Sequence, residues 1–337
     1  MAIDTEKRIL LKDDAGSAGG TASHEEKALL DQEAKGLPPA ESRAKNDLPK
    51  GKIGDVDISR VICGSNLFWG AAHSGELTYV SRLIRSYYTV DKIHETLQIC
   101  EENGVNTNIG DAGMIDRYRK ERGGRMQSIT QVDPDNMRFN PDGSVTTTTD
   151  DIKKVIDRSA EHGAVGTTIV GLRAERYVKA GRMDVIEEFI AYAKSCGLLA
   201  GVGAHDKQVV ISCEEAGIDV DFYFKTIHHD NYYKALPKEN RRPFLVDSFE
   251  AGDHDCIWEQ YPDETIAFMK TVGKPWIGFK VLAAGAIKPA DGFRFAFENG
   301  ADYICVGMFD WQVAEDVGVA LDVLSSDAVK GRARPWV

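Results

Sequence analysis

The sequence lacks paired cysteines, metal-binding motifs and long apolar runs. Its six cysteines are widely spaced and form no CxxC pair, which argues against a disulfide framework and a structural zinc site and favours a reducing compartment. No HxH or HExxH motif occurs. No window reaches the ~18 apolar residues of a membrane span, and the opening stretch MAIDTEKRILLKDDAG has no apolar run of signal-peptide length. We therefore expect a soluble, cytoplasmic protein.

The chain also lacks an excess of basic residues. It has 53 acidic and 41 basic side chains, a net charge of −12. Nucleic acids and anionic membranes both require a basic face on the protein that binds them, so we expect neither as a partner. The expected partners are a small-molecule substrate and further copies of this chain. An anionic substrate would need a local cluster of positive charge.

Two regions differ in composition. Residues 1–51 are rich in Gly, Ala, Ser and charge and almost without aromatics, so we interpret them as a polar N-terminal extension. Residues 52–337 repeat one pattern, in which an amphipathic stretch leads through a glycine into a short apolar run, as in CEENGVNTNIG and FENGADYICVG. Such a glycine commonly ends a helix, and the run that follows is typical of a buried parallel strand. This region is predicted to be a single catalytic domain.

Eight such strands can be counted, mostly separated by helical patterns. Eight βα units in about 270 residues predict an α/β fold of the (β/α)8 TIM-barrel type, with a doubly wound sheet as the alternative. Two longer segments, 67–90 and 229–261, follow carboxyl ends of strands and are expected to form walls or lids of an active site. The predicted strands are residues 58–66, 105–110, 126–133, 166–172, 199–205, 220–228, 276–284 and 303–310.

Ionisable residues occupy three neighbouring strands. Successive strand residues face opposite sides, so if Phe222 and Phe224 face the helices, Tyr223 and Lys225 face the barrel axis. The same alternation predicts Gly278 and Lys280 to face inward on the next strand. On strand 199–205, Gly201, Gly203 and His205 are predicted to face inward.

Two inward lysines on adjacent strands would lower each other's pKa, and burial acts in the same direction. A lysine that is neutral near pH 7 can form a Schiff base with a carbonyl substrate. We therefore predict Lys225 and Lys280 as catalytic, with His205, His228 or Asp133 transferring protons. In the alternative, each lysine is merely neutralised by a carboxylate such as Asp133 or Asp111.

Further polar residues lie at or near strand ends and are predicted to orient or bind the substrate. The glycine-containing turns of LAAGAIKPADGFRFAFENGADYICVG would let backbone N–H groups approach a phosphate, unless these glycines serve only close packing. No cofactor is predicted, but a divalent metal held by His205, His228 and Asp310 is kept as an alternative. The predicted binding residues are Asn66, Gln131, Asp111, His229, Gly285, Gly307 and Asp310.

The segments FKTIHH, GFKVLAAGAI and GADYICVG resemble class I aldolases of the deoxyribose-phosphate type. Those enzymes carry an imine-forming lysine on strand 6, a second lysine on strand 7 and a glycine-rich phosphate site beyond. The resemblance implies that Lys225 forms the imine and that Lys280 modulates it.

The segments GDVDISRVICGSN and ENGVNTNIGDAGMIDRYRKERGG resemble the start of aldo/keto reductases, and Asp111 and Tyr118 would stand for their aspartate and tyrosine. Over residues 52–337 the chain looks most like uncharacterised bacterial barrel proteins described as aldo/keto-reductase-like, which share SNL, GAH, KTIHH, FKVLAAGAI and GMFD. We expect a lyase or isomerase acting on a small polar carbonyl compound, a sugar or sugar-derived acid. The alternatives are NADP-linked reduction, metal-dependent catalysis by a lyase or hydrolase, and a non-catalytic binding barrel.

Overall fold

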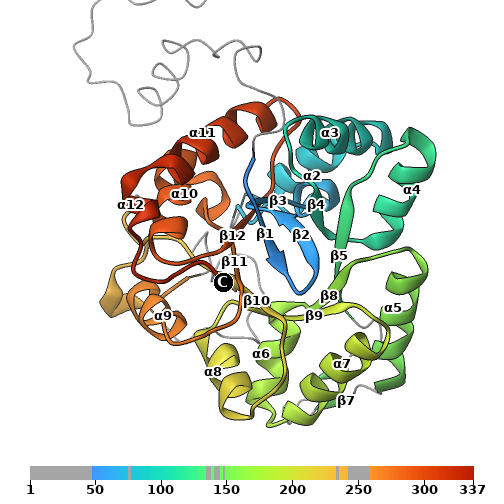
Figure 1. Cartoon of the computed structure of the whole chain (residues 1–337), viewed down its shortest axis with the longest axis vertical. Helices are drawn as coiled ribbons and strands as arrows, with labels where there is room; N and C mark the ends of the chain where they lie inside the picture. Colours follow the sequence, from blue (N-terminus) through green and yellow to red (C-terminus); the bar gives the residue numbers. More distant parts are fainter. Residues whose placement is uncertain are drawn as a thin grey trace, which may run out of the picture. The chain divides into compact units, whose positions relative to one another are not determined.

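The predicted TIM barrel is confirmed. The computed structural model describes residues 48–74, 77–133, 138–139, 145–146, 149–232, 235–241 and 259–337, so that nearly all of the predicted extension lies outside the described residues. Eight parallel strands close into one barrel, with β12 pairing back onto β3 (Figure 1). The barrel strands are β3 (Val61–Gly64), β4 (Thr107–Gly110), β5 (Gln127–Val132), β8 (Gly166–Ile169), β9 (Leu199–Ala204), β10 (Phe222–Thr226), β11 (Trp276–Phe279) and β12 (Tyr303–Val306).

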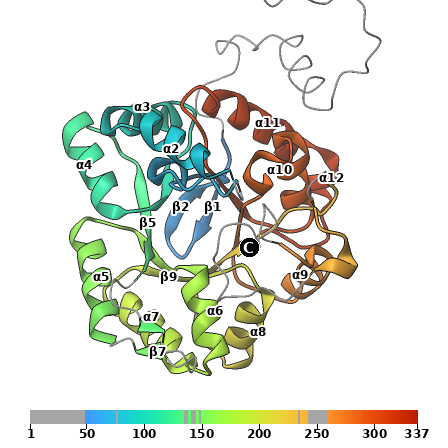
Figure 2. The same cartoon turned by 180° about the vertical axis from the view of Figure 1, so that it is seen from behind.

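Helices surround the barrel, as both views of the chain show (Figure 2). No helix in the described ranges is long and apolar enough to cross a membrane. The α-helices are α2 (Thr78–Tyr87), α3 (Val90–Glu102), α4 (Ala112–Arg122), α5 (Thr149–Glu161), α6 (Gly171–Lys179), α7 (Met183–Ser195), α8 (Lys207–Glu215), α9 (Pro262–Met269), α10 (Pro289–Glu298), α11 (Val313–Ser325) and α12 (Asp327–Lys330). Short 3-10 turns are η2 (Leu67–Trp69), η3 (Lys238–Asn240) and η4 (Ala283–Gly285), and β6 (Arg138–Phe139) pairs with β7 (Val145–Thr146).

An antiparallel hairpin precedes the barrel. It consists of β1 (Lys50–Ile53) and β2 (Val56–Ser59), and β2 leads directly into β3, which places the hairpin at the amino-terminal end of the barrel. Ile53 and Ile58 pack with the side chains inside the barrel and so cover that end. The predicted first strand, 58–66, is therefore divided between β2 and β3, and β1 takes in two residues of the predicted extension.

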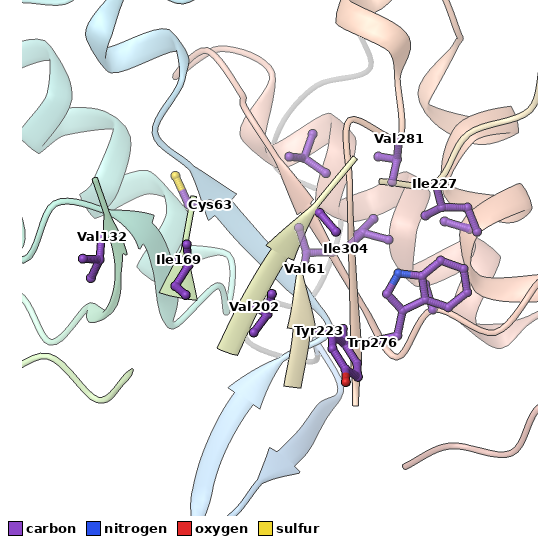
Figure 3. Close-up of a cluster of buried hydrophobic side chains, with 14 of the residues drawn as sticks. Val61, Cys63, Val132, Ile169, Val202, Tyr223, Ile227, Trp276, Val281 and Ile304 are labelled. Atoms are coloured by element: carbon purple, nitrogen blue, oxygen red, sulfur yellow. The ribbon is translucent and has the colours of Figure 1, made fainter. Parts of the chain in front are cut away.

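The strand side chains belong to two separate cores. The inner core joins the hairpin to alternate strand residues that face the barrel axis, among them Phe222, Phe224, Ile277 and Phe279. The outer core packs the other strand faces against the helices, and Figure 3 shows ten labelled members of it. The opposite end of the barrel, where the strands have their carboxyl ends, is not covered by the hairpin and is called the mouth below.

Tyr223 and Lys225 do not face the barrel axis as predicted. Tyr223 belongs to the outer core, and its hydroxyl donates to Glu214 of α8 at 2.6 Å. Because side chains alternate along a strand, Lys225 shares this outward face, while Phe222 and Phe224 face inward. The prediction for β11 was also wrong. Phe279 faces inward and Gly278 faces outward, which is the opposite of the predicted arrangement. A strand buried on both faces is apolar on both sides. The sequence therefore does not show which of the two alternating sets of side chains faces the barrel axis.

On β9 the predicted orientation is correct. Ala200, Val202 and Ala204 belong to the outer core, so Gly201, Gly203 and the residue that follows the strand, His205, point toward the axis. Glycine at an inner position makes room for a neighbouring side chain. A Cβ on Gly201 would lie 2.3 Å from the Phe222 ring.

Candidate active site

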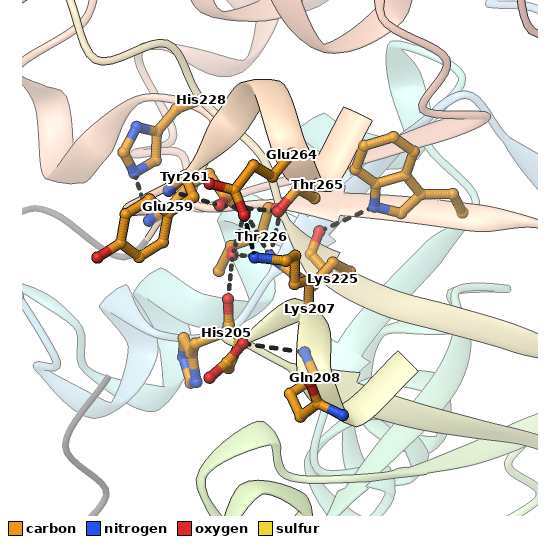
Figure 4. Close-up of polar contacts among 12 residues, drawn as sticks. His205, Lys207, Gln208, Lys225, Thr226, His228, Glu259, Tyr261, Glu264 and Thr265 are labelled. Carbon is orange, nitrogen blue, oxygen red and sulfur yellow. Dashed lines mark hydrogen bonds and ion pairs between the residues drawn. The ribbon is translucent and has the colours of Figure 1, made fainter. Parts of the chain in front are cut away.

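Lys225 is held in a buried ion pair. Its side chain has no exposed surface, and its Nζ lies against the carboxylate of Glu259 (Figure 4). Nζ also donates to the Thr226 hydroxyl at 2.7 Å and to the Thr226 carbonyl at 3.2 Å. Glu259 in turn accepts from the Thr265 hydroxyl at 3.0 Å and from the Tyr261 N–H at 3.3 Å. Both charges are therefore paired and hydrogen-bonded.

This geometry favours the alternative in which Lys225 is neutralised by a carboxylate. The partner is neither Asp133 nor Asp111 but Glu259, 34 positions further along the chain. A lysine turned away from the barrel axis and tied to a carboxylate is badly placed to attack a carbonyl group inside the barrel. We therefore assign Lys225 a structural role.

His228 is fixed in the same network. It is fully buried, its Nδ1–H donates to the His229 carbonyl at 2.9 Å, and its Nε2 accepts the Glu259 N–H at 3.1 Å (Figure 4). Burial lowers the pKa of His228 to about 4, although the neighbouring carbonyl and Glu259 act in the opposite direction. The imidazole is neutral at pH 7 and bonded at both nitrogens. His229 accepts an N–H from Asn231 at 3.2 Å.

His205 stands at the mouth and is oriented by a buried carboxylate. Glu175, on α6, is 4% exposed and accepts the backbone N–H groups of both His205 and Asp206. Its two oxygens also lie 3.1 and 3.3 Å from His205 Nδ1. A carboxylate favours the tautomer with hydrogen on Nδ1, which makes Nε2 the nitrogen that can take up a proton. This is the usual arrangement of an oriented general base.

Lys280 and His73 are the charged and polar neighbours of His205. Lys280 follows β11 directly and has a left-handed backbone with φ of 58°, whereas His73 follows η2 with φ of 50°. Non-glycine residues rarely adopt this conformation, which costs about 1 to 3 kcal/mol and is concentrated at functional sites. His73 Nε2 lies 3.0 Å from the side-chain nitrogen of Asn66, one of the predicted binding residues.

Electrostatic effects connect these three side chains. Burial lowers the pKa of His73 well below its ordinary value, and Lys280 and His205 lower it further. Burial also lowers the pKa of His205, as do Lys280 and Lys225, while Glu175 acts in the opposite direction. Both histidines are therefore neutral at pH 7 beside the Lys280 side chain. A neutral histidine can act as a base, and a neighbouring cation can stabilise negative charge on a substrate.

Aromatic side chains form the floor of the mouth. Within the inner core most strand residues are fully buried, but Phe224, Cys305 and Phe279 keep 5%, 8% and 9% of their surface exposed. The rings of Phe224 and Phe279 stack at 4.1 Å, and the His205 ring meets Phe279 edge-on at 5.4 Å. Gln131 shares the inward face of β5 with Ile129, as predicted.

Two predicted acidic residues are engaged elsewhere. Asp133 is exposed and forms an ion pair with Arg173, with oxygens 2.6 and 3.4 Å from its guanidinium. Asp111 caps α4, since its carboxylate accepts the Met114 N–H at 2.7 Å. Neither contact involves a lysine of the mouth.

Asp310 is also paired, with Lys92 at 3.1 Å and with the Tyr87 hydroxyl. The alternative metal set of His205, His228 and Asp310 is not brought together in the structure. No group of three potential metal ligands was found among the described residues.

The predicted phosphate turns are exposed at the mouth side of β11 and β12. Gly285 has φ of 90° and closes η4, in which Ala283 and Ala284 are also left-handed. A Cβ on Gly307 would lie 3.3 Å from the Leu67 side chain, which is close but not prohibitive. Phosphate binding at these turns stays a prediction.

Tyr118, the residue matched to the reductase tyrosine, lies away from the mouth. It is 1% exposed, and its hydroxyl donates to Glu101 at 3.0 Å. Tyr118 is therefore not placed to act as the reductase tyrosine at the mouth, whereas Asp111 directly follows β4 and also caps α4.

Sequence reasoning assigned no role to three residues that lie against predicted site residues, which are His73, Glu175 and Glu259. His73 lies in a segment predicted as a wall without individual roles. Glu175 lies in the helix after β8, and only its distance from His205 in space reveals it. A local signal for the position of His205 was available. The segment GAH ends β9 and is followed by a helix with an aspartate cap, which indicates that His205 lies at the mouth.

Comparisons with known proteins support the fold. The sequence matches no protein-family profile and no curated protein. A solved structure from Pseudomonas aeruginosa, described as "Putative aldo-keto reductase", superposes with a TM-score of 0.55 at 14% identity, covering 86% of this chain and all of the other. A second structure described in the same terms from that organism gives a TM-score of 0.54 at 14% identity, with 84% and 99% covered.

A further solved structure aligns less well. It comes from Coccidioides immitis, is described as "putative deoxyribose-phosphate aldolase", and gives a TM-score of 0.38 at 12% identity, with 85% of this chain and 94% of the other covered. At 14% identity, the two structures with TM-scores above 0.5 show a shared barrel fold and no more. This fold is used by several enzyme superfamilies, so the reaction has to be argued from the site.

Proposed function

We propose that this protein is an enzyme that transfers protons on a small polar carbonyl compound, a sugar or sugar-derived acid, as an isomerase or lyase. The observation that carries the proposal is the pairing of His205 with buried Glu175 beside Lys280 and His73 at the mouth. Active sites of TIM-barrel enzymes lie at this end of the barrel.

His205 serves as the general base. Its lowered pKa keeps it neutral at pH 7, and Glu175 holds Nδ1 so that Nε2 can accept a proton from the carbon next to a carbonyl group. As that proton leaves, negative charge develops on the carbonyl oxygen. The Lys280 ammonium stabilises this oxyanion, or, in the alternative, a neutral Lys280 forms an imine with the carbonyl carbon and the carbonyl oxygen leaves as water.

The rest of the mouth supports a small substrate with one apolar side. The exposed edges of Phe224 and Phe279 offer an apolar floor, while the amides of Gln131 and Asn66 can bind hydroxyl groups. A short hydroxy-aldehyde, hydroxy-ketone or keto acid combines these properties.

Hydrogen exchange at carbon tests the proposal. The purified full-length protein is incubated in D2O with a panel of small hydroxy-aldehydes, hydroxy-ketones and keto acids, and proton NMR follows deuterium incorporation next to the carbonyl. We expect incorporation for at least one compound, and a loss of about 100-fold or more in His205→Gln. His162→Gln, which changes a histidine paired with Asp116 outside the site, is the control and should keep full activity.

Borohydride distinguishes the two roles of Lys280. If an imine forms, reduction in the presence of the active compound leaves a covalent adduct on the peptide that contains Lys280. Exchange without an adduct means that Lys280 acts only through its charge. If no compound of the panel exchanges, or if His205→Gln exchanges as fast as the wild type, the proposal is wrong.

A further inference from the structure

Exposed apolar side chains are concentrated on one part of the surface. Ten large hydrophobic residues in the described ranges are exposed, and seven of them come from η2, α2, the turn into α3 and the segment after β12. Scattered exposed apolar residues need no explanation, but a contiguous group of them does. We call this group the α2 face, which consists of Trp69, Leu77, Tyr79, Leu83, Tyr87, Val90 and Trp311.

Helix spacing and contacts within the structure connect five of these residues, and Leu77 and Val90 lie next to the ends of α2 in the sequence. Tyr79, Leu83 and Tyr87 are spaced four residues apart on α2 and so form a stripe along one side of the helix. The Arg85 guanidinium donates to the Trp69 carbonyl at 3.4 Å, which holds η2 against α2. The Tyr87 ring contacts Phe309 at 5.4 Å, and Phe309 stacks on Trp311 at 5.6 Å.

The α2 face is large enough for a protein interface. Its side chains are 37% to 62% exposed. Aromatic residues carry 150–250 Å² each, so the face offers roughly 600 to 700 Å² of mainly apolar surface. The largest patch on a typical monomer is about 300–600 Å², and each partner of a stable complex buries about 800 Å².

The composition of the α2 face matches that of an interface core. Residues 77–87 contain no Asp, Glu or Lys, in a chain of which 28% is charged. Their two charged residues are arginines, and Arg82 is exposed. Interface cores are enriched in Tyr, Trp and Arg and depleted in Lys, Glu and Asp.

We propose that a second copy of this chain packs on the α2 face, giving a twofold symmetric dimer. In such a dimer the same face meets itself, so a stripe of Tyr79, Leu83 and Tyr87 packs against its own counterpart. Arg82 beside the stripe can lie over an aromatic ring of the other copy, which avoids bringing the two arginines together. The area of the face is close to what each copy needs to bury.

Sedimentation velocity of the full-length protein between about 1 and 100 µM tests the proposal. We expect a dimer, and we expect Leu83→Glu to weaken association at least 10-fold by placing a charge at the centre of the stripe. Leu236→Glu is the matched control, because Leu236 is also an exposed leucine, at 42%, but lies outside the α2 face. It should leave the dimer unchanged.

A second measurement tests the interface without the glutamate variant, in case that variant misfolds. Ser86→Cys, at an exposed position of α2, should form a dimer joined by a short bifunctional thiol reagent, whereas Ser325→Cys on α11 should not. A protein that is monomeric at about 100 µM overturns the proposal and leaves the face to a different partner. A dimer that survives Leu83→Glu and is not cross-linked at position 86 also overturns it, because its interface must lie elsewhere.

Discussion

Lys225 and Glu259 form an ion pair that is sealed from solvent between the barrel and α9. Lys225 has no exposed surface and the Glu259 side chain is 3% exposed. Each of them also bonds to a threonine hydroxyl, Thr226 and Thr265 respectively. A buried pair of this kind adds little stability compared with apolar residues, yet it cannot lose one member without leaving a buried charge.

We predict that Lys225→Met lowers the free energy of unfolding by about 3 to 5 kcal/mol, because Glu259 is then left without its cation. Urea denaturation measures the change. The double variant Lys225→Met with Glu259→Leu should recover part of the loss. If the single variant is as stable as the wild type, the ion pair is not formed in solution.

Glu175→Gln should reduce catalysis while leaving the fold intact, because glutamine keeps an oxygen that accepts the His205 and Asp206 N–H groups. We expect kcat to fall about 100-fold with little change in KM. Since the carboxylate raises the pKa of His205, its removal should move the acidic limb of the pH–rate profile to lower pH. A reduced rate with an unmoved limb would mean that Glu175 supports the fold and not the proton transfer.

His228 makes stability depend on pH. Its pKa is lowered from 6.5 to about 4, so as the pH falls through this window the unfolded chain binds the proton first and folding is weakened. His205 and His73 act in the same direction. His228→Gln can keep both hydrogen bonds of the imidazole without titrating. We expect a flatter loss of stability from pH 6.5 to 4, measured by urea denaturation, and near wild-type stability at pH 7.

Lys280→Gly separates backbone strain from chemistry. Glycine adopts φ of 58° without steric cost, so we expect a free energy of unfolding about 1 kcal/mol above that of Lys280→Met, which keeps the strained backbone. Both variants should lose at least about 100-fold in exchange activity, because the cation is removed. Equal stability of the two variants would show that the left-handed backbone is not strained.

Much of the fold could be predicted from residues close together in sequence. Glycines that end helices and short apolar runs are local signals, and they identified all eight barrel strands. Strand ends were less exact, since Ile58 belongs to the hairpin and not to β3. The site was predicted only in part. His205 was placed correctly because β9 alternates between glycine and larger residues. This alternation shows which side chains of the strand face the barrel axis.

The sequence by itself determined the barrel, the position of the mouth and the inward direction of His205, because these follow from periodicity and strand order. Only the tertiary structure decided which way Lys225 points, because every residue of β10 is buried and the pattern does not distinguish the two faces. The tertiary structure also decided which side chains contact one another. Glu259 reaches Lys225 and Glu175 reaches His205 from distant positions, and the left-handed backbone of Lys280 breaks the alternation of β11. Pairings across 30 or more residues depend on how the chain closes in space, which no local pattern records.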